Sequence, residues 1–134
     1  MEELKKQIGL PNNMNKPLIV VNFKTYETAS GDSAVSLAQE MDKFTDREFR
    51  MIAVASAFDL SSIAKSVTNV EVWSQHLDPV GKGSHTGWLE PDVALHHGAV
   101  GTIINHAEHK VSLEHVEKLM SMLPEDFPIC ACAA

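Results

Sequence analysis

The sequence is poor in cysteine, in aromatic side chains and in positive charge. Its 134 residues include two cysteines, 6% aromatic residues, and 11 Lys and Arg against 18 Asp and Glu. The formal net charge of -7 argues against nucleic acid or an anionic membrane as a partner, although a small anionic ligand needs only local positive charge. No apolar run approaches the roughly 18 residues of a membrane span, and the N-terminus lacks the pattern of a secretory signal. These absences predict a soluble protein of the reducing cytoplasm.

The two cysteines, Cys130 and Cys132, lie two residues apart near the end of the chain. On a strand they point to the same side, where a disulfide between them would be strained. Two thiolates are also too few ligands for a zinc site. We therefore expect two small buried strand residues.

The apolar content, 44%, is enough for one modest core and predicts a single domain. Residues 1–15 are polar and contain the turn-forming sequence Pro11-Asn12-Asn13, so we expect a polar leader outside the core, with Met14 as an alternative start. The folded domain is predicted over residues 16–134.

Short apolar runs alternate with amphipathic segments along this domain. Strands are expected at 18–21, 51–55, 70–73, 100–104 and 129–132. Asp32 or Ser33, Asp59 and Ser112 are the expected N-caps of helices between them. The alternation is typical of a parallel sheet covered by helices. The helix faces expected to pack on the sheet are Ala34, Leu37, Ala38, Met41 and Phe44, and Val116, Leu119, Met120 and Leu123.

Polar side chains follow three of the predicted strands, at the edge where ligands of parallel sheets bind. A lysine there supplies charge for a phosphate or a developing enolate oxygen, and a neutral histidine polarises a carbonyl group. A solvated loop residue is the alternative for each side chain alone, but their coincidence on one edge favours a site. The residues are Asn22 and Lys24 after the first strand, Gln75, His76 and Asp78 after the third, and Asn105, His106 and Glu108 after the fourth.

No metal site is predicted from the seven histidines. The pairs His106/His109 and His96/His97 are the local clusters, and neither matches a zinc signature. The nucleophile elbow and the phosphate-loop motifs are absent as well. The glycine-rich segment 80–89 is instead expected to be an exposed loop used for binding or subunit contact.

Four blocks of sequence resemble the triosephosphate isomerase family, particularly its shorter archaeal branch. They are Val-Asn-Phe-Lys (21–24), Gln-His-Leu-Asp-Pro (75–79), Gly-Ser-His-Thr-Gly (83–87) and Gly-Thr-Ile-Ile-Asn-His-Ala-Glu (101–108). The resemblance covers roughly residues 16 to 132 and implies a partial (β/α)₈ barrel of about strands one to five. An open parallel α/β sheet is the alternative fold.

The resemblance also implies roles for individual residues. Asn22 and Lys24 would bind substrate, His106 and Lys24 would act in catalysis, and Glu108 would hold Lys24. Supporting roles fall to Asn105, Gln75 and His76, and the loop of His85, Thr86 and Gly87 would enter a partner subunit. The implied reaction interconverts dihydroxyacetone phosphate and glyceraldehyde 3-phosphate, in glycolysis and gluconeogenesis, without a metal or organic cofactor.

The chain also departs from the family pattern. A barrel of this kind needs at least about 200 residues, and the family's catalytic glutamate, lid and phosphate loops follow the fifth strand. Loss of a general base costs typically 10²–10⁴-fold, so we expect the chain alone to be a poor or inactive isomerase. We expect either a homo-oligomer or a complementing C-terminal half. The alternative function is a non-catalytic module that binds phosphorylated sugars or associates with other subunits.

Overall fold

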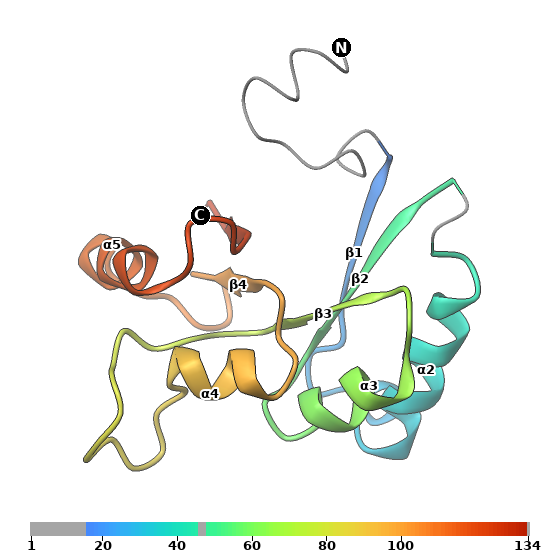
Figure 1. Ribbon diagram of the computed structural model, residues 1–134, viewed down its shortest axis with the longest axis horizontal. Helices are drawn as coiled ribbons and strands as arrows, with labels where there is room; N and C mark the ends of the chain where they lie inside the picture. Colours follow the sequence, from blue (N-terminus) through green and yellow to red (C-terminus); the bar gives the residue numbers. More distant parts are fainter. Residues whose placement is uncertain (1–15, 46–47, 134) are drawn as a thin grey trace.

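Five parallel strands form one sheet in sequence order, β1-β2-β3-β4-β5, in the computed structural model, which describes residues 16–45 and 48–133 (Figure 1). The strands are β1 (Leu18–Asn22), β2 (Arg50–Ala55), β3 (Glu71–Ser74), β4 (Thr102–Ile104) and β5 (Ile129–Ala131). The helices between them are η2 (Glu27–Ala29), α2 (Asp32–Asp42), α3 (Leu60–Ser66), α4 (Pro91–His96) and α5 (Leu113–Met122). The sheet is curled, so the predicted partial barrel is confirmed over the open alternative.

Side chains of β2 alternate between the two faces of the sheet, as the period of a strand requires. Ala53 and Ala55 belong to the cluster that packs under α2 and α3, which lie on the same side of the sheet in Figure 1. Ile52 and Val54 point to the inner face, where they pack with Trp73 and Ile103.

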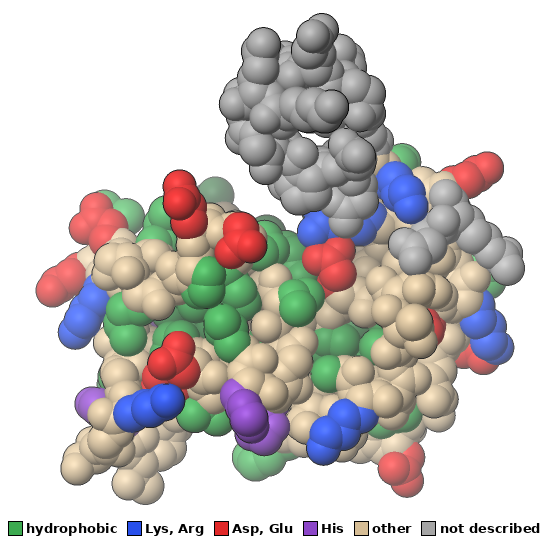
Figure 2. Space-filling model, in the orientation of Figure 1, with side chains coloured by type: hydrophobic (Ala, Val, Ile, Leu, Met, Phe, Trp, Pro, Cys, Tyr) green, Lys and Arg blue, Asp and Glu red, His purple; other side chains and the backbone are tan. Residues whose placement is uncertain are grey.

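The inner face is only partly covered. Val20 of β1 pairs in register with Ile52, yet Val20 and its neighbour Leu18 are exposed. Hydrophobic side chains also reach the surface between charged ones on the face drawn in Figure 2. Apolar surface of this kind, on a strand with one neighbour, is suited to a further strand or subunit.

The start of α2 differs from the sequence expectation. Its N-cap is Gly31, with φ 61°, so neither Asp32 nor Ser33 caps the helix. The Gly31 N–H is satisfied from outside the helix, by the Asp59 carboxylate at 3.1 Å. Asp59 is the N-cap residue of α3, as predicted, but its side chain joins two helices instead of capping its own. Ser112 caps α5 in the expected way, because its Oγ accepts the His115 N–H at 3.1 Å.

Four apolar positions are more exposed than the sequence predicted. Phe44 follows the end of α2, and Met120 lies on the outer side of α5, so both predictions of burial were wrong. Cys130 is also exposed and Cys132 is half-buried, and both are free thiols. The reason is that β5 lies at the edge of the sheet, with β4 as its neighbour on one side. Such exposure depends on neighbours that a local pattern does not contain.

The predicted leader, residues 1–15, lies outside the described residues. Within residues 16–45 and 48–133, none of the helices has the length and apolar character needed to cross a bilayer.

Candidate active site

A pocket of about 510 Å³ opens where β1, β3 and β4 end. Most of the polar residues predicted for the site contribute to its wall. The lining is Asn22, Lys24, Thr25, Tyr26, Ala57, Ser74, Gln75, His76, Leu89, Ile103, His106, Glu108 and His109. Parallel strands therefore bring together side chains that are far apart in the sequence.

Lys24 is held in a left-handed backbone conformation two residues after the end of β1, with φ 49°. Its N–H donates to Asn22 Oδ1 at 2.9 Å, and its carbonyl accepts from Gln75 Nε2 at 2.9 Å. Gln75 Nε2 also lies 3.4 Å from Asn22 Oδ1. These hydrogen bonds to a conformation that is unfavourable for lysine indicate a residue fixed in place by its surroundings.

The Lys24 ammonium contacts the Glu108 carboxylate, 84 residues along the chain, with Nζ 2.9 Å from Oε1. The hydrogen bond with Glu108 raises the pKa of Lys24, and the same contact lowers the pKa of Glu108. The two side chains are 33% and 61% exposed, so solvent screens their attraction. The pair therefore orients the ammonium more than it stabilises the fold. Tyr26, which the sequence analysis missed, lies beneath it, with its ring centroid 5.8 Å from Nζ.

His106 receives a hydrogen bond from the backbone of the same glutamate. The Glu108 N–H donates to His106 Nδ1 at 3.1 Å, so Nδ1 carries a lone pair. A neutral ring then has its hydrogen on Nε2. The Glu108 carboxylate lies farther from Nδ1, at 3.5 Å, so the shorter contact with the N–H sets the tautomer. His106 is therefore arranged as a donor through Nε2.

Asn105 acts behind the pocket wall. Its φ is 60°, its Oδ1 accepts the Val111 N–H at 3.0 Å, and its Nδ2 donates to the Cys132 carbonyl at 3.0 Å. It thus ties the loop that carries His106 to the segment after β5. A supporting role suits this geometry better than contact with a ligand.

His76 lines the pocket but is itself almost fully buried. Its Nε2 lies 2.9 Å from Asp78 Oδ1, and its ring stacks on His109 with centroids 3.9 Å apart. Burial lowers the pKa of His76 and outweighs the opposing effect of Asp78. The buried ring is therefore biased towards the neutral form.

The loop containing His85, Thr86 and Gly87 does not line the pocket described above. Two hydrogen bonds between Asp78 and Leu89 join the ends of this loop. The Asp78 N–H donates to the Leu89 carbonyl at 2.9 Å, and Asp78 Oδ2 accepts the Leu89 N–H at 2.8 Å. The loop is exposed and projects away from the sheet between β3 and α4 (Figure 1). Trp88, which the sequence analysis did not select, is 56% exposed beside it.

Comparison with known proteins agrees with this arrangement. The family model described as Triosephosphate isomerase matches residues 17–132. A triosephosphate isomerase of Methanothermus fervidus is 33% identical over 114 residues, which cover 84% of this chain and 51% of the relative. The triosephosphate isomerase of Archaeoglobus fulgidus is 36% identical over 109 residues, which cover 81% of this chain and 48% of the relative. The triosephosphate isomerase of Methanococcoides burtonii is 43% identical over 103 residues, which cover 76% of this chain and 46% of the relative.

The chain thus spans about half the length of the curated relatives it matches. The matched region includes the whole sheet and every residue of the pocket. By its sequence and its fold, the chain belongs to the triosephosphate isomerase family.

Proposed function

We propose that this chain provides the N-terminal part of a triosephosphate isomerase active site, in the cytoplasm, for glycolysis and gluconeogenesis. The reaction is the interconversion of dihydroxyacetone phosphate and glyceraldehyde 3-phosphate by proton transfer, without a metal or organic cofactor. The observation that carries the proposal is the contact of Glu108 with both functional side chains. Its carboxylate holds Lys24, and its backbone N–H sets the tautomer of His106.

Each of these side chains has a role in the proposed reaction. The Lys24 ammonium offsets the charge of the phosphate and of the enediolate oxygen. His106 donates from Nε2 to a substrate oxygen as negative charge develops there. Asn22 fixes the Lys24 backbone and borders the same pocket, so it is placed to contact the substrate.

The step at the substrate carbon needs a base. Among the residues lining the pocket, the one carboxylate is that of Glu108. It is engaged by Lys24, which lowers its pKa, so it is a weak base. We therefore propose that the base comes from a complementing C-terminal half, and that the 134-residue chain alone has little activity.

Association is the second part of the proposal. The exposed apolar side chains of β1 and the exposed Trp88 beside the Thr86 loop favour a homo-oligomer or the complementing half. They also favour the alternative function, a module that binds phosphorylated sugars or associates with other subunits without catalysis. The two functions differ in whether the chain, once mixed with the complementing half, converts the substrate.

The test is an isomerase assay of the purified chain, alone and mixed with a separately produced C-terminal half of the Methanococcoides burtonii enzyme. We expect activity near background for the chain alone, and an increase in the mixture that His106→Ala abolishes. His97→Ala, on the exposed end of α4, is the matched control and keeps the increase.

Binding is measured separately as a thermal shift with phosphoglycolate, a mimic of the enediolate. A shift that Lys24→Met removes, without turnover in the mixture, supports the binding module. Activity of the chain alone that His106→Ala abolishes would contradict the proposed absence of a base. If a cooperatively folded sample shows no thermal shift with phosphoglycolate and no turnover in the mixture, the assignment of the pocket is overturned.

A further inference from the structure

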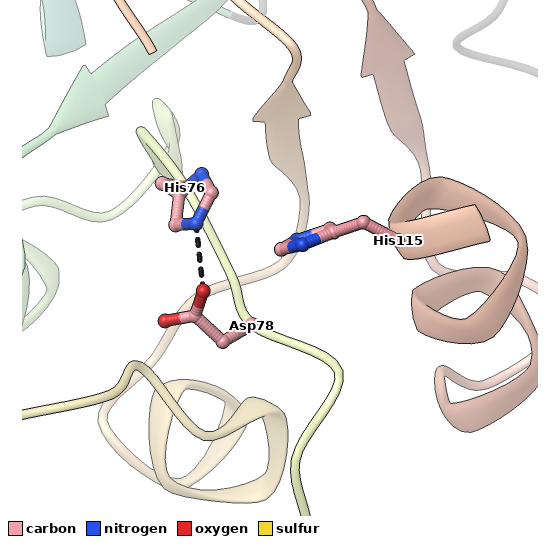
Figure 3. A group of neighbouring side chains, drawn as sticks. All are labelled: His76, Asp78 and His115. Atoms are coloured by element: carbon pink, nitrogen blue, oxygen red, sulfur yellow. Dashed lines mark hydrogen bonds and ion pairs between the residues drawn. The ribbon is translucent and has the colours of Figure 1, made fainter. Parts of the chain in front are cut away.

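A second group of titratable side chains lies beside the pocket. His76 and Asp78 come from the loop after β3, and His115 from the first turn of α5 (Figure 3). One ligand atom of each lies within 4.8 Å of the other two. Local histidine spacing did not reveal this group, because His115 is distant from the other two in sequence.

Asp78 and His115 are each held by a backbone contact from outside the group, and His76 is held by Asp78. Asp78 Oδ2 accepts the Leu89 N–H at 2.8 Å, and Asp78 Oδ1 faces His76 Nε2. His115 Nε2 lies 3.0 Å from the Leu77 carbonyl. Histidines that bind metals typically donate one ring N–H to a carbonyl or carboxylate, which fixes the direction of the ring.

The charge of the group is also suited to a cation. His76 and Asp78 are only 6% and 8% exposed, and the side chain that bonds Asp78 among the described residues is the His76 ring. A buried carboxylate facing two imidazoles is less well neutralised than one facing an arginine. A bound dication would supply the missing positive charge.

We propose that His76, Asp78 and His115 bind a divalent transition-metal ion of the Zn²⁺ class at the rim of the pocket. Two imidazole nitrogens and one carboxylate oxygen are typical zinc ligands, and three protein ligands leave a position for water. Mg²⁺ and Ca²⁺ need more oxygen ligands than this group offers.

Binding requires a small rearrangement of the group. The hydrogen between His76 Nε2 and Asp78 Oδ1, which lie 2.9 Å apart, moves to Nδ1 of the same ring, so that the Nε2 lone pair faces the ion. The separation of Nε2 and Oδ1 then widens to roughly 3.4 Å, between ligands about 2.0–2.2 Å from the metal. The ion then cross-links the loop after β3 to α5. It takes no part in the proposed isomerisation, so the two proposals stand independently.

The test is metal binding by the metal-stripped chain, produced without a histidine tag. We expect Zn²⁺ at micromolar concentration to raise the thermal midpoint, Co²⁺ to give the visible absorption of a bound ion, and Mg²⁺ to have no effect. His115→Gln is the variant that removes a ligand. The His115 side chain is only half-buried, and a glutamine amide can still donate to the Leu77 carbonyl that His115 contacts, so we expect the variant to fold. We expect its Zn²⁺ affinity to fall at least about tenfold.

Two control variants address the other donors. His97→Gln removes an exposed imidazole, and the double variant Cys130→Ser/Cys132→Ser removes both thiols, and each is expected to bind Zn²⁺ as the parent does. Unchanged affinity in His115→Gln would overturn the proposal, and so would loss of binding in the thiol variant. The absence of Zn²⁺ binding by a cooperatively folded parent chain would overturn it too.

Discussion

Replacement of Gly101 by alanine tests the packing of the inner face. Gly101 directly precedes β4, and a Cβ placed there would lie 2.3, 2.4 and 2.6 Å from three atoms of the Trp73 ring. Ordinary carbon contacts are about 3.5–4.0 Å, so the ring would have to move by about 1 Å. Trp73 is buried against Ile52, Val54 and Ile103 and has little room to do so.

Overpacking of a core costs typically about 1–3 kcal/mol, and three simultaneous clashes with a rigid ring place Gly101→Ala at the upper end, about 3 kcal/mol. The measurement is urea unfolding followed by circular dichroism and by Trp73 fluorescence. A Trp88→Phe background removes the signal of the exposed indole.

Gly81→Ala is the matched control. A Cβ at Gly81 meets nothing within 4 Å, so we expect a change within about 0.5 kcal/mol. A Gly101→Ala protein as stable as the parent, to within that same about 0.5 kcal/mol, would refute the placement of Trp73 over β4.

Three further predictions concern charged groups. Asp42 accepts three consecutive backbone N–H groups before β3, which outweigh its desolvation and lower its pKa. Asp42→Asn should therefore cost about 1–2 kcal/mol at pH 7, and the difference from the parent should shrink as the pH falls below about 4 through the lowered pKa; equal losses at pH 7 and pH 2 would contradict this. Glu71→Gln breaks a half-buried, two-bond contact with Arg50 across β2 and β3 and should cost about 1.5 kcal/mol in urea unfolding, whereas a change too small to measure would show that solvent already screens the pair. Glu108→Gln should lower the Lys24 pKa in an NMR titration and weaken phosphoglycolate binding; an unaltered Lys24 titration would show that the ion pair does not form.

The sequence by itself determined the order of the five strands and of the helices α2, α3 and α5 between them. Strand and helix periods are local, because a strand alternates every second residue and a helix turns every 3.6 residues, so apolar spacing reports them directly. The same locality placed Asn22, Lys24, Gln75, His76 and His106 at strand ends. Parallel strands open on one edge, so these residues had to approach one another, and they line one pocket.

Tertiary structure alone decided which partners these residues have. The Asp59 carboxylate accepts the Gly31 N–H instead of capping its own helix, because the loops before α2 and α3 meet. Cys130 is exposed because β5 is an edge strand, and strand position within a sheet has no local signature. Glu108 orders both Lys24 and His106, and His115 joins His76 and Asp78, through contacts between distant segments. Hydrogen bonds and ion pairs act over a few ångströms in space, and distance along the chain does not predict them.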